Sequence, residues 1–251
     1  SLDYRKDYEL LFSVRLAAQC TDERVNKVTP ALYARFPTLE ALAEADIAEV
    51  ERYIHSTGFF RAKAKDIVLA SQMLLRDYGG RVPDTMEELL EAGFAPEYSI
   101  AFANRCMSRR NKGRIFTTFD MVVIDMYDGT MRSFKQGASV TYVIRPGDDG
   151  NEVSQITSTT LPVGVLDDAE CDMADVKLAA GDAVVMVSDG LSDMDVSNHM
   201  QDVLKEIRVG DSRRMVDDIL GAMIGQGDVS LRDDVTVMAA VISGSEKSSA
   251  A

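Results

Sequence analysis

The hydrophobic periodicity of this 251-residue chain differs between its two halves: the first reads as helices, and the second as short strands interrupted by helical stretches around 197–207 and 212–225. Up to about Ala92, apolar residues recur every three or four positions, as in YELLFSVRLAAQ (8–19), which predicts consecutive amphipathic helices. From about Phe116 the chain breaks into short β-rich runs such as FDMVVIDMY (119–127) and AVVMVS (183–188). We therefore predict an α+β chain: a fragment of an all-α helical bundle, followed by a partial α/β sandwich with mainly antiparallel sheets.

Capping and turn residues mark the ends of these elements. Thr38 and Thr85 suit helix N-caps, and Gly79-Gly80 suits a C-terminal cap. Asp128-Gly129 is a hairpin turn signal between two β-rich runs. Three segments are expected: an incomplete helical segment at 1–92, a sandwich domain at 93–242 and a disordered tail at 243–251.

Composition narrows the classes of protein that the chain can belong to. No stretch reaches the roughly 20 consecutive apolar residues of a membrane span, and SLDYRKDYE at the start lacks an apolar signal core, so we expect a cytoplasmic protein without a membrane partner. Cys20, Cys106 and Cys171 lie far apart, which excludes an iron–sulfur cluster or zinc site built from them. The net charge of −14 argues against DNA as a partner.

Two acidic positions in the second half have the setting of a metal site. The run GDAVVMVSDGLSD (181–193) places Asp189 at the carboxyl end of an apolar strand, and Asp233-Asp234 stands before the last strand in RDDVTVM (232–238). Hard divalent cations take carboxylate oxygens from separate elements, so Asp189 and Asp233 are candidate ligands for Mg²⁺ or Mn²⁺. From the residues alone, an Asp-Gly turn and a solvated acidic pair remain open as alternatives.

The second half resembles the metal-dependent PPM-type protein serine/threonine phosphatases, within them the stage II sporulation protein E branch. The resemblance rests on four blocks in family order: FTTFDMVVIDMYDGTMRSFKQGAS (116–139), TTLPVGVLDD (159–168), GDAVVMVSDGLSD (181–193) and RDDVTVM (232–238). It implies two packed antiparallel sheets with helices outside, Asp189 and Asp233 as ligands of one ion, and Gly137, Pro162 and Gly164 shaping nearby loops. The implied substrate is a phosphoprotein.

The family mechanism uses two metal ions and a water that bridges them, so the resemblance assigns no catalytic residue of the protein itself. It also requires an aspartate from a D-G-M/F-G-x-G motif that bridges both ions, and this sequence lacks that motif. Asp120 and Asp125 lie on a strand that the family uses structurally, and neither is assigned to the missing role. We therefore expect half of a binuclear centre with weak affinity for Mn²⁺ or Mg²⁺, and little activity from this chain alone.

The first half resembles endonuclease III, a helix-hairpin-helix DNA glycosylase and abasic-site lyase. The matching blocks are ELLFSVRLAAQCTDERVNKVTPALY (9–33), STGFFRAKAKDI (56–67) and GGRVPDTMEELL (79–90). The resemblance implies that Gln19 faces DNA and fills the space of a flipped base, with Asn26 and Lys63 in the same blocks. The family's phosphate-gripping hairpin, catalytic lysine and aspartate, and four cluster cysteines do not follow Leu90, so this DNA contact is vestigial.

The chain thus joins the front of one enzyme to the back of another, and we infer a chimera. Three functions remain open at this stage: a phosphatase-like hydrolase of phosphoserine or phosphothreonine, a DNA-repair glycosylase fragment, and a non-catalytic chimera. Because each half lacks elements that its relatives pack against, we also expect exposed apolar faces that favour self-association.

Overall fold

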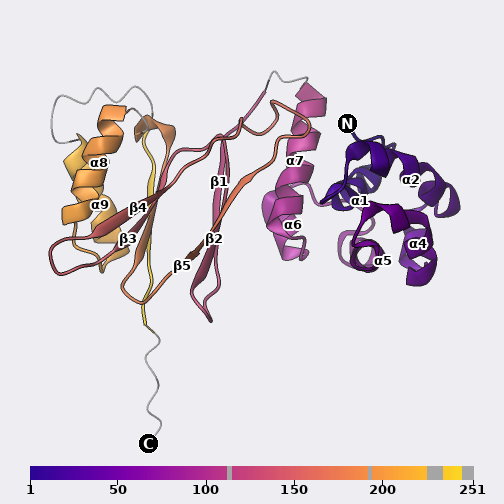
Figure 1. Ribbon diagram of the computed structural model, residues 1–251, viewed down its shortest axis with the longest axis horizontal. Coiled ribbons are helices and arrows are strands. Elements are labelled where there is room, and N and C mark those ends of the chain that lie inside the picture. The colour runs from indigo at the N-terminus through magenta and orange to yellow at the C-terminus, as the bar shows by residue number, and fades with distance from the viewer. Residues whose placement is uncertain (112–114, 192–193, 225–233, 245–251) are drawn as a thin grey trace, which may run out of the picture. The chain divides into compact units, whose positions relative to one another are not determined.

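The computed structural model describes residues 1–251 except 112–114, 192–193, 225–233 and 245–251 (Figure 1). The chain divides into two compact units. Unit 1 comprises Ser1–Phe116 with Gly164–Ala169, and unit 2 comprises Thr117–Val163 with Glu170–Ala251. None of the described helices is both long and apolar enough to cross a membrane.

Unit 1 is helical, as the periodicity predicts. Its elements are α1 (Asp7–Ala17), α2 (Asp22–Arg35), α3 (Leu39–Ala43), α4 (Ile47–Ile54), the 3₁₀ turn η1 (His55–Thr57), α5 (Phe60–Tyr78), α6 (Met86–Glu91) and α7 (Pro96–Asn111). The side chain of Thr38 accepts a hydrogen bond from the Ala41 amide, and Thr85 accepts one from the Glu88 amide, so both expected N-caps are present. Gly79 ends α5 in a left-handed conformation (φ 59°).

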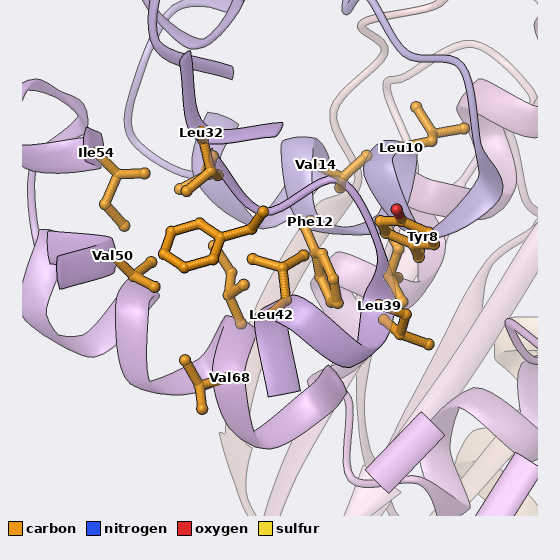
Figure 2. Packing of buried hydrophobic residues seen from close by; sticks show 14 of the residues in the cluster. Tyr8, Leu10, Phe12, Val14, Leu32, Leu39, Leu42, Val50, Ile54 and Val68 are labelled. Carbon is orange, nitrogen blue, oxygen red and sulfur yellow. The ribbon is translucent and has the colours of Figure 1, made fainter. Parts of the chain in front are cut away.

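The apolar stripes of these helices form one core. Figure 2 shows Leu32 of α2, Leu42 of α3, and Val50 and Ile54 of α4 pointing toward a common interior. All four side chains are fully buried, which accounts for the periodicity seen in the sequence.

Helix α7 completes unit 1 together with a loop from much later in the chain. The Asn104 side chain donates to the carbonyl oxygen of Leu166 (2.8 Å) and accepts from the Gly164 amide (2.8 Å). The structural units therefore divide at Phe116, while the change in sequence resemblance falls near residue 92.

Unit 2 contains two antiparallel sheets. Its strands are β1 (Phe119–Ile124), β2 (Thr130–Gln136), β3 (Thr141–Arg145), β4 (Glu152–Ile156), β5 (Asp172–Lys177), β6 (Ala183–Val187) and β7 (Val237–Val241). The strand orders are β1-β2-β5 and β4-β3-β6-β7, and every pairing is antiparallel. This confirms the predicted α+β class.

Two apolar layers hold unit 2 together. Helices α8 (Met194–Glu206) and α9 (Ser212–Ile224) cover one face of the four-stranded sheet, with Leu204 and Ile219 packed against Val185 (Figure 1). A second cluster joins Met131 of β2 to Val143 of β3 and Val184 of β6. The two sheets therefore face each other across this second layer.

Candidate metal centre

Asp189 stands where the apolar strand β6 gives way to the 3₁₀ turn η2 (Asp189–Leu191). The strand is buried up to Val187, and Leu191 is buried again just beyond the turn. Asp189 itself is exposed. Burial on both sides fixes the backbone while the carboxylate faces solvent, which is the arrangement expected of a ligand at a strand end.

Ser188 ties this end of β6 to the segment that leads into β7. Its amide donates to the Thr236 carbonyl oxygen (3.0 Å), its hydroxyl oxygen accepts from the Thr236 amide (2.9 Å), and its hydroxyl donates to the Asp234 carbonyl oxygen (3.2 Å). The described part of the RDDVTVM block, which starts at Asp234, therefore lies next to the end of β6 that carries Asp189. The second expected ligand, Asp233, lies outside the described residues.

The ligand atoms at this end of β6 are of the type that a hard cation prefers, but they are few. Carboxylate oxygens are the ligands that Mg²⁺ and Mn²⁺ prefer. Within the described part of the chain, no three His, Cys, Asp or Glu side chains are grouped to hold an ion. The ligand roles of Asp189 and Asp233 therefore stay predictions.

A polar cluster between the two sheets was not anticipated from the sequence. Lys135, at the end of β2, is fully buried and bonds through its Nζ to Asp120 Oδ2 on β1 (2.5 Å) and to Thr141 Oγ1 at the start of β3 (2.8 Å). Thr141 Oγ1 also donates to Asp120 Oδ2 (2.9 Å). Burial lowers the pKa of Lys135, and the adjacent Asp120 carboxylate opposes that shift.

One sequence signal could have revealed this cluster. Met131, Ser133 and Lys135 alternate along β2 and so share the face that meets the other sheet. A lysine on such a face needs a buried partner, and β1 offers Asp120 directly opposite Lys135 in the register.

The loops at this end of the sandwich are closely packed. Gly137 has φ +62°, and a Cβ there would lie 2.7 Å from Pro162, so no larger residue fits without movement. Asp172 accepts hydrogen bonds from the Thr159 amide (2.6 Å), the Thr160 amide (3.1 Å) and the Ser158 hydroxyl (3.1 Å). Burial would raise the pKa of Asp172, but these hydrogen bonds outweigh it and hold the pKa below its usual value.

Gln19 lies in unit 1, just after α1, with an exposed side chain and a left-handed backbone (φ 54°). The nearby ammonium of Lys63 donates to the carbonyl oxygens of Leu16 (2.9 Å), Ala18 (2.9 Å) and Thr57 (2.7 Å). Lys63 is therefore a structural residue that holds the chain just before Gln19 against the 3₁₀ turn η1.

Two relatives match the C-terminal part of the chain. The PP2C phosphatase domain of stage II sporulation protein E from Bacillus subtilis, solved with a fragment of its regulatory domain, superposes with a TM-score of 0.56 at 24% identity, over 63% of this chain and 47% of that one. The curated Bacillus subtilis protein is 27% identical over 158 residues, which are 61% of this chain and 19% of its relative. The fold is therefore that of a PP2C-like phosphatase domain.

The family profile described as stage II sporulation protein E matches residues 79–243. The chain belongs to the stage II sporulation protein E family.

The N-terminal part has a different relative. Endonuclease III of Synechocystis sp. is 57% identical over 90 residues, which are 36% of this chain and 41% of that protein. The chain therefore carries two segments with different relatives and spans less than half the length of either curated protein.

Proposed function

We propose that unit 2 is a phosphatase-type domain that hydrolyses phosphoserine or phosphothreonine in a protein substrate, with Mn²⁺ or Mg²⁺ held by Asp189 and Asp233. The observation that carries the proposal is the tie from Ser188 to Thr236 and Asp234, which brings the two acidic blocks to one end of the sandwich. When bound, the ion supplies charge neutralisation and an activated water.

In this proposal, the protein's own residues hold the metal ion and orient its ligands. The exposed carboxylate of Asp189 binds the ion, while the buried flanks of η2 keep that carboxylate in place. Two carboxylates alone bind such ions weakly, so turnover requires further ligands besides Asp189 and Asp233. We therefore expect low activity from the isolated chain.

The test compares Asp189→Asn with Asp175→Asn, a matched change at an exposed aspartate on β5. Mn²⁺ binding is measured by calorimetry, and hydrolysis of a phosphoserine peptide is followed with and without Mn²⁺. We expect Asp189→Asn to weaken Mn²⁺ binding at least about tenfold and to remove the Mn²⁺-stimulated hydrolysis, while Asp175→Asn changes neither. Equal binding by the two variants would contradict the proposal.

We propose no DNA-repair activity for unit 1. Gln19 supplies an amide, which can form hydrogen bonds but cannot act as the nucleophile that a lyase needs.

A further inference from the structure

The buried cluster around Lys135 joins the two sheets where the chain crosses between them. Residues 137–140 connect β2 to β3, and the bond from Lys135 Nζ to Thr141 Oγ1 closes this crossover. Asp120, on the neighbouring strand β1, accepts from both groups. One carboxylate, one ammonium and one hydroxyl thus fix the spacing of the sheets at this end.

This end of the sandwich is also the end that carries the candidate ligand. Thr141 pairs with Met186 in the β3–β6 register, and Asp189 follows three residues later. At about 3.3 Å per residue, the cluster lies on the order of 10 Å along the strand from Asp189. A shift of β3 at Thr141 would therefore pass directly to the strand that presents Asp189.

Stability alone does not account for the cluster. Removing a charged pair from water is costly, and an apolar pair of similar volume is often as stable or more stable. Such a pair would continue the apolar layer formed by Met131 and Val143. In the described structure, the buried Oδ1 of Asp120 and the buried Oγ of Ser133 have no hydrogen-bond partner, so the charges are not optimally satisfied.

We infer that Lys135 is a positioning residue for the metal site: through Asp120 and Thr141 it holds the two sheets at the separation that presents Asp189 to the ion. The inference rests on the proposed function for the identity of the ion. Lys135 itself is fully buried and touches neither ion nor substrate.

The decisive variant is the double change Asp120→Leu with Lys135→Met, which replaces the charged pair by an apolar pair and leaves no unpaired charge. We expect its thermal unfolding midpoint to stay at or above the wild-type value, while its Mn²⁺ affinity falls about tenfold, as when a residue behind a metal ligand is lost. The single change Thr141→Val should give a smaller loss of affinity. Wild-type Mn²⁺ affinity in a stable double variant would overturn the inference.

A matched control lies on the opposite, exposed face of the same strand. Arg132 on β2 pairs with Asp175 on β5 (3.1 Å), and Arg132→Met with Asp175→Leu should leave Mn²⁺ affinity unchanged. An equal loss of affinity in this control would assign the effect to general perturbation of β2 and would also overturn the inference.

Amide hydrogen exchange of the metal-free protein separates this inference from the proposed function. If Lys135 positions the site, the amides of residues 186–191 exchange at least about tenfold faster in the Asp120→Leu/Lys135→Met protein, while those of β4 are unchanged. Protection equal to wild type at 186–191 would refute the positioning role. Wild-type protein that binds no Mn²⁺ through Asp189 would refute the proposed function, and the exchange result would still decide the role of Lys135.

Discussion

Each unit of the molecule buries a lysine ammonium, and the two are stabilised in different ways. Lys63 in unit 1 donates to three backbone carbonyl oxygens and pairs with no carboxylate through a described hydrogen bond or salt bridge. Lys135 in unit 2 bonds to the Asp120 carboxylate and the Thr141 hydroxyl. The first fixes a single path of the backbone, and the second joins two separate sheets.

The difference determines what each lysine can control. Backbone carbonyls are present whatever the sequence, so Lys63 acts on the local chain path, including the left-handed residues Gln19 and Phe59 beside its partners. Burial lowers the pKa of Lys63. The partners of Lys135 are side chains, so the pair can be exchanged as a whole and can be retained for a reason other than stability.

The largest effect is expected for Lys63→Met. It leaves three carbonyl groups without their donor, and at the usual cost of a buried unsatisfied acceptor we expect a loss of about 4 kcal/mol in the free energy of unfolding. Urea unfolding followed by circular dichroism measures this loss. Lys65→Met, at an exposed position of the same helix, should change stability by less than about 0.5 kcal/mol. A loss below about 1 kcal/mol for Lys63→Met would show that water replaces the ammonium and would remove the contrast with Lys135.

A somewhat smaller effect is expected for the single change Lys135→Met. It leaves the Asp120 carboxylate, 16% exposed, without its cation, and we expect a loss of about 3 kcal/mol. Adding Asp120→Leu should restore stability to at least the wild-type level in urea unfolding. No single side-chain change can rescue Lys63→Met in this way, because its acceptors belong to the backbone. Failure of the second change to restore stability would mean that the two lysines are equivalent structural residues.

Much of the fold could be predicted from the sequence because local rules determine it. Periods of three to four residues predicted the helices of unit 1, and Thr38 and Thr85 cap helices as expected. The β-rich runs and the Asp128-Gly129 turn predicted the antiparallel β1–β2 hairpin. These features depend on residues that are close in the chain.

The Lys135 cluster and the makeup of unit 1 depend instead on contacts between distant residues. Asp120 and Lys135 became partners only through the β1–β2 register, and Thr141 only through the packing of one sheet on another. The loop at Gly164–Ala169 joins unit 1 through Asn104 of α7, which lies some 60 residues earlier in the chain. At the candidate metal site, the exposed strand-end setting of Asp189 was predictable, while Asp233 lies outside the described residues and its role as a ligand stays a prediction.

The smallest effect is expected at Asp172. Like Lys63, this residue is a charged group stabilised by neutral hydrogen-bonding partners, but its charge is negative. Its carboxylate is held by amide and hydroxyl donors of residues 158–160. It is partly exposed, so we expect Asp172→Asn to cost only about 1 kcal/mol at neutral pH.

The pH dependence of this loss tests its origin. The folded-state pKa of Asp172 lies below the ordinary value of 3.8, so below that value the unfolded chain binds more protons than the folded chain. The contribution of Asp172 is therefore fully present above the ordinary value and is lost as the pH falls through the lowered folded-state pKa. In urea unfolding from neutral pH to pH ~3, the stability gap between wild type and Asp172→Asn should shrink, whereas Asp148→Asn, at an exposed loop position, should show no such convergence. A stability gap that stays constant with pH would mean that the negative charge of Asp172 does not contribute to stability. Stabilisation of a charge by neutral hydrogen-bonding groups would then apply to Lys63 but not to Asp172.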